Sequence, residues 1–493
     1  MSGKPTSVLH GAMLMVGMRW VDRLIGLMST LILARLLVPE DLGIIAMSSL
    51  VVGLADMLLD LGVEAALIRN REATREHYDS AWTLRLLQMC LSAGLVVLCA
   101  PLAAAYFQEP RVEPVLQVTA LSLVLGGLQN IGIVNFQKEM RFREDFRFTF
   151  LRRIVGFAAT MILAWVLRSY WALVIGALAG RLFGLLLSYT MHPMRPRLHW
   201  SKVREIFGFS QWMLVRGIGL YLDATLHRFF VGGRSGSAVM GGYSLANDIA
   251  AMPSSELLMP LNRVLFPALV DAKHDLSELA RKFLLAQGVQ VVFALPASVG
   301  LALVAHDAVP VLLGEKWVFA VPFVQLLALV HAARALTSSS SFLLLTLGRP
   351  RQAATLAWFQ VLVFTVPAMT IWASGGATEM AISRILAAVF GVGLAGVLVH
   401  RALPAVGYVA MLGTAIRPAV AITAMIAVVS ALRDFTEPLG HLLSMLVLVN
   451  CGAITYAIVL LVLWWAGGRP LSAERYLIEN FARPMLLRLR GRL

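Results

Sequence analysis

The stretch LLSMLVLVNCGAITYAIVLLVLWWA, residues 442–466, decides the class of this fold, because its 25 residues include no charged side chain. About 20 apolar residues in a helix are enough to cross the hydrocarbon core of a bilayer. Backbone polar groups in that core must bond to one another, so only helices and closed barrels can span it. The stretch therefore predicts a transmembrane helix.

The rest of the chain has the same apolar character. Across 493 residues, 59% are hydrophobic and 14% are charged, and the mean hydropathy is +0.77. Soluble domains hold about 25% charged residues, and disordered chains have low hydrophobicity. Alternation of apolar and polar residues, which is typical of a transmembrane barrel, is missing. The composition predicts an all-α integral membrane protein and excludes the water-soluble, disordered and fibrous classes.

Apolar runs of spanning length predict about fourteen transmembrane helices. The expected spans are 9–34, 42–66, 82–107, 112–136, 149–168, 171–190, 206–230, 240–265, 283–305, 319–346, 352–373, 378–400, 414–432 and 442–466. Cys90, Cys99 and Cys451 all lie inside these spans, so a structural disulfide is not expected. The ten histidines show no metal-type spacing, and we expect neither a metal nor another cofactor.

Basic residues gather on one side of these spans. With the N-terminus inside, inward-facing segments hold 28 Lys and Arg residues, Arg152 and Arg153 among them, and outward-facing segments hold 6. Because Lys and Arg accumulate in cytoplasmic loops, this asymmetry predicts that both termini are cytoplasmic. The net charge of +14 is spread over many membrane-proximal loops, so it does not indicate nucleic-acid binding. The tail 468–493 mixes apolar residues with Arg, which is typical of an interfacial helix on anionic lipid.

Eight arginines lie within the spans: Arg19, Arg23, Arg85, Arg181, Arg216, Arg228, Arg334 and Arg384. Arg85 and Arg228 lie near expected helix ends, from which long side chains reach the headgroups. A central arginine that faces lipid costs about 2.5 to 3.5 kcal/mol, so the others should face a water-filled cavity or a partner. Guanidinium groups match the oxygens of phosphate. As substrate-binding cavity cations we expect Arg19, Arg23, Arg216, Arg334 and Arg384.

Polar side chains in the same spans leave two interpretations open. The carboxylates can form structural ion pairs with arginines, or one of them can bind a coupling ion, H+ or Na+. The serines of the tenth span can contact a sugar, or they can let helices pack closely. The candidates for ion coupling are Asp22, Asp56, Asp223 and Asp248, and those for sugar contacts are Ser338, Ser339 and Ser340.

The seventh expected span resembles the first. A shift of 193 residues pairs six identical residues in 25 columns, including Arg23 with Arg216 and Gly43 with Gly236. This match fits a duplicated six-helix unit, the arrangement that places a transporter's site at the midplane between repeats. The expected organisation is therefore an N-terminal lobe 1–200, a C-terminal lobe 201–402, two added helices in 403–467 and the tail 468–493.

Five motifs carry a family resemblance. They are ARLLVPEDLG (34–43), NFQKEMRF (135–142), GGYSLANDIAAMP (241–253), NRVLFPAL (262–269) and LGEKW (313–317). In these motifs the chain resembles the polysaccharide transporter (Wzx-type) flippases of the MOP exporter superfamily, in the branch that includes the colanic acid exporter.

The resemblance implies two six-helix lobes around a central cavity, with an extra helix pair that forms a groove for a lipid tail. It also implies a substrate, an undecaprenyl-diphosphate-linked oligosaccharide, which alternating access moves from the cytoplasmic to the periplasmic leaflet. That step serves exopolysaccharide, capsule or O-antigen synthesis in the bacterial inner membrane. The implied partners are membrane lipids and the polysaccharide polymerase and export machinery.

Two other functions are alternatives. A multidrug exporter of the same fold (MATE type) usually serves cations and would need an acidic, aromatic cavity, which the arginines argue against. A membrane enzyme of the same pathway, a polymerase or glycosyltransferase, commonly carries a sizeable extramembrane loop, and no expected loop here exceeds about twenty residues. We therefore expect a flippase rather than an enzyme.

Overall fold

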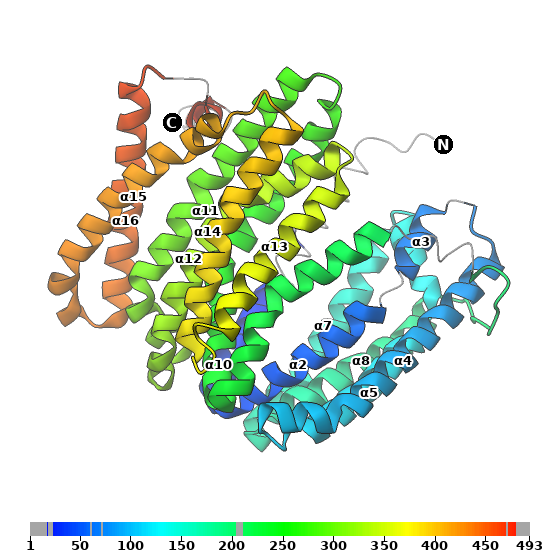
Figure 1. The fold of residues 1–493 in the computed structure, drawn as a ribbon. Helices are drawn as coiled ribbons and strands as arrows, with labels where there is room; N and C mark the ends of the chain where they lie inside the picture. Colours follow the sequence, from blue (N-terminus) through cyan, green and yellow to red (C-terminus); the bar gives the residue numbers. More distant parts are fainter. Residues whose placement is uncertain are drawn as a thin grey trace, which may run out of the picture. The chain divides into compact units, whose positions relative to one another are not determined.

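A computed structural model describes residues 17, 23–59, 62–70, 72–203, 211–469 and 472–479, without the side chains of 211–214 and 257–266. Within these residues the chain forms helices joined by short turns, and no strand is present (Figure 1). The predicted all-α class is confirmed. The chain divides into two compact units, and each is described by itself.

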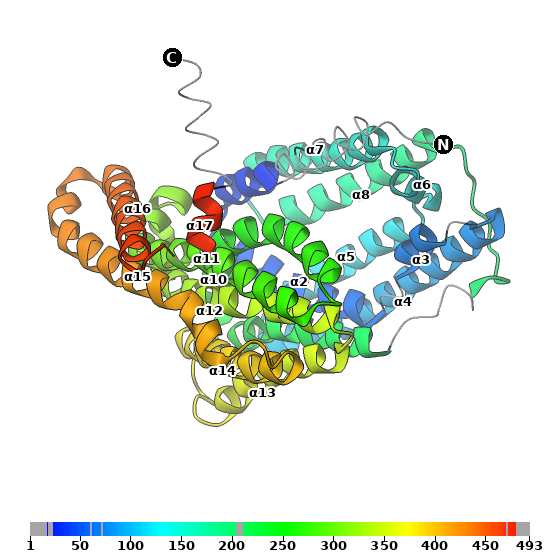
Figure 2. The same ribbon diagram turned by 90° about the horizontal axis from the view of Figure 1, so that it is seen from above.

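Unit 1 comprises Met1–Leu214 and Arg228–Gly241. Residues 23–36 are helical, and the helices that follow are α2 (Pro39–Leu59), α3 (Val63–Arg69), α4 (Arg75–Phe107), α5 (Val112–Gly127), η1 (Ile131–Ile133), α6 (Val134–Lys138), α7 (Phe142–Leu167) and α8 (Trp171–Met191). Helices α7 and α8 lie side by side (Figure 2). They approach closely because glycines face each other, and a Cβ atom on Gly180 would lie 3.0 Å from the Cα of Gly156.

Unit 2 comprises Val215–His227 and Gly242–Leu493. Beyond α10 (Gln211–Asp271), which both units share, its elements are α11 (Leu276–Leu313), η2 (Glu315–Ala320), α12 (Val321–Thr346), α13 (Pro350–Met369), α14 (Ala377–Ala402), α15 (Tyr408–Thr436), η3 (Glu437–Leu439), α16 (His441–Ala466) and α17 (Ala473–Leu477). Helices α15 and α16 pack together against α11, and Val292, Ala421 and Leu448 belong to the core between them.

Helix α10 contains a sharp break at Gly236, where φ is 77° and ψ is 172°. Glycine tolerates this positive φ because it has no Cβ atom. The break separates two helical arms, as the two expected spans 206–230 and 240–265 require. Glycine also permits close backbone approach nearby, since a Cβ atom on Gly241 would lie 2.2 Å from the carbonyl oxygen of Pro39.

Ten of the described helices are long and apolar enough to cross a membrane. An eleventh span is formed if α5 and the bent segment Ile131–Lys138, which meet at 66°, count as one. The remaining expected spans fall on the two arms of α10 and on the helix that includes residues 23–36. The division expected between 168 and 171 is confirmed, because α7 ends at Leu167 and α8 begins at Trp171.

Candidate functional site

Asp223 lies at the centre of a buried charge cluster in unit 2. Its Oδ1 atom accepts a 2.6 Å hydrogen bond from Nη1 of Arg384, and its Oδ2 atom accepts one from Nη2 of Arg334. The carboxylate comes from α10, and the two arginines come from α14 and α12. Three helices therefore converge on one carboxylate, and we call this group the Asp223 cluster.

Local sequence features place these three helices. Helix α12 begins with Pro322 in its first turn, where a missing N–H costs nothing. Helix α14 is capped by Glu379, whose carboxylate accepts a 2.9 Å hydrogen bond from the backbone N–H of Gly376. Helix α10 packs on α13 at Gly219, where a Cβ atom would lie 3.0 Å from the indole of Trp358. That contact lies one turn before Asp223.

The two arginines of the cluster differ in exposure. The side chain of Arg384 is 6% exposed and that of Asp223 is 5% exposed, whereas that of Arg334 is 34% exposed. Arg384 therefore acts as a buried anchor. Arg334 gives part of its guanidinium to Asp223 and keeps N–H donors for a further acceptor. The cluster holds two positive charges and one negative charge, so a net positive charge faces the accessible side of Arg334.

An aromatic group stabilises α10 one turn after Asp223. His227 donates from Nε2 to the carbonyl oxygen of Ala224 over 3.0 Å, because a carbonyl oxygen can only accept. In the neutral imidazole, Nδ1 then accepts the hydroxyl proton of Tyr243 over 2.8 Å. The rings of Phe364 and Tyr243 contact the imidazole edge to face. These contacts hold α10 against α13 and so fix the position of the carboxylate.

The serines of α12 that we predicted as sugar contacts differ in burial. Ser339 is buried and donates a 2.8 Å hydrogen bond to Oε1 of Gln290 on α11. Ser340 is fully buried, and its hydroxyl has no hydrogen-bond partner among the described residues. Ser338 is half-buried. A role for these serines in sugar contact stays a prediction, and helix packing already accounts for Ser339.

The other predicted site residues lie outside the Asp223 cluster. Arg216 is half-buried on α10, and its Nε atom has no hydrogen-bond partner within the described chain. Asp248 is exposed on α10, and Asp56 is half-buried on α2. Arg23 is exposed. Arg19 and Asp22 lie outside the described residues.

Three arginines lie farther from the starts of their helices than the expected spans place them. Arg85 follows the first residue of α4 by ten residues, so it does not lie at a helix end. Arg152 likewise follows the first residue of α7 by ten residues, and Arg153 by eleven, because α7 begins at Phe142, before the expected span 149–168; their inward-facing position stays a prediction. An apolar run in the sequence ends at the first charged residues. The helix itself continues through those residues, because its backbone hydrogen bonds do not depend on side-chain charge. Counting the full length of each helix, instead of the length of its apolar run, would have placed these arginines inside the helices.

An apolar groove runs between α11, α15 and α16 in unit 2. Its volume is about 770 Å³, and its lining includes Phe293, Ala453 and Leu461. Leu477 of α17 and Ile478 line it as well, together with Glu474. The carboxylate of Glu474 accepts a 3.1 Å hydrogen bond from Arg417 of α15, and this ion pair holds α17 against the groove. The groove can accept a long apolar chain.

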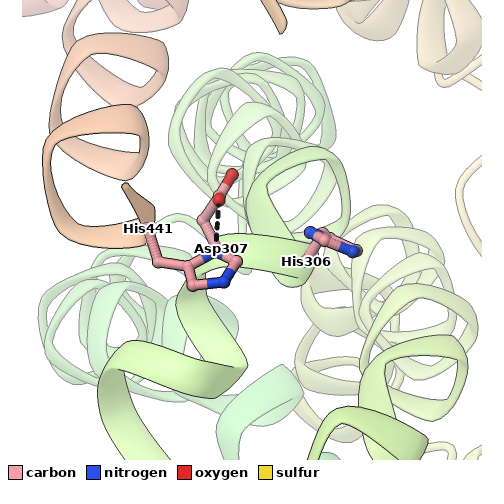
Figure 3. A group of neighbouring side chains, drawn as sticks. All are labelled: His306, Asp307 and His441. Carbon is pink, nitrogen blue, oxygen red and sulfur yellow. Dashed lines mark hydrogen bonds and ion pairs between the residues drawn. The ribbon is translucent and has the colours of Figure 1, made fainter. Parts of the chain in front are cut away.

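Three side chains near one end of α16 form a group with metal-ligating atoms (Figure 3). His306, Asp307 and His441 each offer one ligand atom, and these atoms lie within 4.8 Å of one another. Nδ1 of His441 lies 2.9 Å from Oδ1 of Asp307, and the hydroxyl of Ser444 donates to Oδ2 over 3.3 Å. Two imidazoles and a carboxylate suit Zn2+. The sequence gave no sign of this group, because His441 is far along the chain from the other two.

The chain matches a model of the family described as polysaccharide biosynthesis protein over residues 32–322. The lipopolysaccharide biosynthesis protein WzxC of Escherichia coli (strain K12) is 28% identical over 357 residues, which cover 70% of this chain and 71% of WzxC. The succinoglycan biosynthesis transport protein ExoT of Rhizobium meliloti (strain 1021) is 28% identical over 336 residues, 67% of each chain.

Two solved structures show the same fold. The lipid II flippase MurJ in its inward closed conformation matches with a TM-score of 0.75 and 13% identity, over 92% of this chain and 99% of MurJ. An inward-facing multidrug resistance MATE family transporter of the MOP superfamily matches with a TM-score of 0.58 and 14% identity, over 77% of this chain and 95% of the transporter. The chain has the fold of these transporters and belongs to the polysaccharide biosynthesis protein family.

Proposed function

We propose that this protein is a flippase that moves a lipid-linked oligosaccharide, joined to its polyprenyl carrier by a diphosphate, from the cytoplasmic to the periplasmic leaflet. The observation that carries the proposal is that unit 2 holds both a net positive polar centre and a long apolar groove. A substrate with a charged head and a polyprenyl tail needs both. The similarity to WzxC and ExoT supports a transport step in polysaccharide biosynthesis.

The Asp223 cluster supplies the chemistry for the diphosphate. Arg334 is oriented by its hydrogen bond to Asp223, so little side-chain freedom is lost when its remaining N–H groups meet phosphate oxygens. Charge-assisted hydrogen bonds of this kind are roughly twice as strong as neutral ones. Arg216 lies seven residues before Asp223 on α10, two turns away on the same helix face, and adds a second positive charge. Arg19 and Arg23 remain proposed cavity cations.

The groove supplies the apolar half of the site. A polyprenyl tail in the groove of α11, α15 and α16 would exchange lipid contacts for contacts with Phe293 and Leu461. This exchange is close to neutral in energy, because lipid tails are as apolar as leucine. The groove therefore guides the tail rather than holding it tightly, which suits a carrier that must be released.

The geometry of the Asp223 cluster also reduces the number of carboxylates that we propose for ion coupling. Each carboxylate oxygen of Asp223 accepts from a guanidinium group, and the two positive charges beside it repel a further cation such as Na+. We propose that Asp223 anchors the arginines, and that H+ or Na+ is coupled through Asp22, Asp56 or Asp248. The relatives are named for transport or biosynthesis, and we propose transport without covalent catalysis.

Location, domains and partners complete the proposal. The described helices that are long and apolar enough to cross a membrane support a bacterial inner membrane protein, in which we propose cytoplasmic termini. We keep the lobes 1–200 and 201–402, the added helices 403–467 and the tail 468–493 as the proposed organisation. Membrane lipids surround the chain, and polymerase and export machinery would receive its product. No nucleic acid is involved in this scheme.

Reconstitution tests the function directly. The purified protein is placed in liposomes with a fluorescent undecaprenyl-diphosphate-linked oligosaccharide, and a membrane-impermeant quencher reports the rate of leaflet exchange. Exchange faster than in protein-free liposomes supports the flippase. Release or elongation of the oligosaccharide would support the membrane enzyme instead, and transport of a cationic dye alone would support the multidrug exporter.

A further inference from the structure

Three arginines in unit 1 lie ten residues from one end of their helices. Arg85 follows the start of α4 by ten residues, Arg152 follows the start of α7 by ten, and Arg181 precedes the end of α8 by ten. At 1.5 Å per residue, each lies about 15 Å along its helix from that end. Helix α8 has 21 residues, the length that crosses a bilayer, so Arg181 lies at its middle. We call these residues the arginine ring.

The members of the ring lie close enough for their charges to interact. Arg152 experiences the charges of both Arg85 and Arg181, and Arg85 experiences that of Arg181. The carboxylate of Glu64 on α3 forms a 2.7 Å ion pair with Arg85 and faces no other ring member as closely. Within the described part of the chain, neither Arg152 nor Arg181 forms a salt bridge. The ring thus has three positive charges and one negative charge.

The surrounding helices are shaped to hold these side chains. Gly184 on α8 leaves room for the stem of Arg152, since a Cβ atom there would lie 2.6 Å from Cδ of Arg152. Gly126 on α5 lies beside Arg181, where a Cβ atom would be 3.4 Å from Nη1. The face of Phe148 contacts the guanidinium of Arg152 at 5.6 Å. The stem of Arg152 is therefore fixed by packing, and no described carboxylate forms a salt bridge with it.

A cavity of about 340 Å³ opens beside the ring. Its lining includes Arg152 and Arg181, and it also carries the hydroxyl-bearing residues Ser29 and Thr160. The volume lies within the range of small-molecule sites. Repulsion among like charges in a membrane-embedded bundle destabilises it unless an anion is present. The hydroxyl of Thr160 donates to the carbonyl oxygen of Gly156 over 2.8 Å, so the guanidinium groups are the donors that match the tetrahedral oxygens of phosphate.

We propose that unit 1 has its own binding site for a phosphate-type oxyanion, in which Arg152 and Arg181 bind the anion and Arg85 adds its charge. The site is separate from the Asp223 cluster, which lies in unit 2 and is compensated by a carboxylate. Binding of the oxyanion does not depend on the proposed function. Its role as a second position for the substrate's diphosphate does rest on that function.

Calorimetric titration of the purified full-length protein with inorganic pyrophosphate, at constant ionic strength, tests the site. We expect saturable binding to the wild type and at least a tenfold weaker affinity in Arg181→Gln, because a charge-assisted hydrogen bond is lost. Arg152→Gln should show the same loss. Arg181→Lys should bind with intermediate affinity, because it keeps the charge and loses the planar fork. Arg143→Gln is the matched control, since it removes one exposed charge from α7 and should leave the affinity unchanged.

The proposal is overturned if the wild type does not bind pyrophosphate, or if folded Arg181→Gln binds it as tightly as Arg143→Gln does. Size-exclusion profiles identify misfolded variants, and Arg181→Lys serves if Arg181→Gln does not fold. Competition in nanodiscs separates the sources of the oxyanion: phosphatidylglycerol displaces pyrophosphate if lipid headgroups reach the cavity, and an undecaprenyl-diphosphate lipid displaces it if the substrate does. Failure of leaflet exchange with intact, Arg181-dependent pyrophosphate binding would contradict the flippase and leave this site standing.

Discussion

The Asp223 cluster and the arginine ring both contain arginines, and they differ in how a carboxylate compensates the positive charge. In the cluster, one buried carboxylate accepts hydrogen bonds from both Arg334 and Arg384. In the ring, the carboxylate of Glu64 is 57% exposed and forms its ion pair with Arg85. The cluster is therefore part of the packed interior and tolerates substitution poorly. The ring is held by helix packing, and its charge is available to a ligand. Variants in the cluster should therefore lose more stability, and variants in the ring should change ligand binding more.

Removing the central carboxylate should have the largest effect on stability. Asp223→Asn leaves the buried guanidinium of Arg384 and the partly exposed one of Arg334 without a counter-charge, and breaking a buried pair typically costs about 3–5 kcal/mol. We expect a lower unfolding temperature and less folded protein in detergent. The double variant Asp223→Asn with Arg384→Met should recover part of the loss. Equal unfolding temperatures for Asp223→Asn and the wild type would show that the cluster is not a structural anchor.

The two arginines of the cluster should respond differently. Arg334→Gln should slow leaflet exchange about 10- to 100-fold, because a hydrogen bond to a charged ligand contributes about 1.5–3 kcal/mol. Its unfolding temperature should fall less than that of Arg384→Gln, whose side chain is 6% exposed. Thermal unfolding and liposome exchange are measured on the same preparations. The reverse order of stability would contradict the assignment of anchor and ligand.

The apolar groove lies in unit 2, as the Asp223 cluster does. Filling the groove should affect transport without affecting either arginine site. Ala453→Trp places an indole among the lining residues and obstructs the path of the tail, so exchange should be slower than in the wild type. Ile454→Trp is the matched control, because the neighbouring side chain is 57% exposed and does not line the groove. Equal rates for these two variants would exclude the groove as the path of the tail.

The smallest effect is expected at Glu64. The ion pair with Arg85 is largely exposed on the Glu64 side, so Glu64→Gln should change the free energy of unfolding by less than about 1 kcal/mol. Pyrophosphate should bind roughly two- to fivefold more tightly, because the ring loses its competing carboxylate. Calorimetry on Glu64→Gln and the wild type compares the two affinities. Weaker binding would mean that Glu64 orients Arg85 for the ligand.

Much of the fold could be predicted from hydropathy. The boundary between α7 and α8 was correct because a charged turn separates two apolar runs. The sequence also placed Asp223, Arg334 and Arg384 within transmembrane spans, the arginines as cavity cations and the aspartate as a candidate for ion coupling. It could not pair them, because the two arginines follow Asp223 by 111 and 161 residues, and helix packing alone brings them together.

The arginine ring could not be predicted from the sequence for a different reason. Apolar windows ended near Arg85 and Arg152 and placed both near the membrane surface, although α4 and α7 each begin ten residues earlier. Helix ends depend on capping and backbone hydrogen bonds, which a hydropathy average does not measure. The group of His306, Asp307 and His441 was missed because its members come from two helices, α11 and α16.

Leaflet exchange in liposomes is the most direct test of the central claim that the arginines of this fold serve a diphosphate-linked lipid. We predict rapid exchange of the undecaprenyl-diphosphate-linked oligosaccharide by the wild type and by Arg143→Gln, and at least tenfold slower exchange by Arg334→Gln. Wild-type exchange no faster than in protein-free liposomes, or an unchanged rate in folded Arg334→Gln, would contradict it.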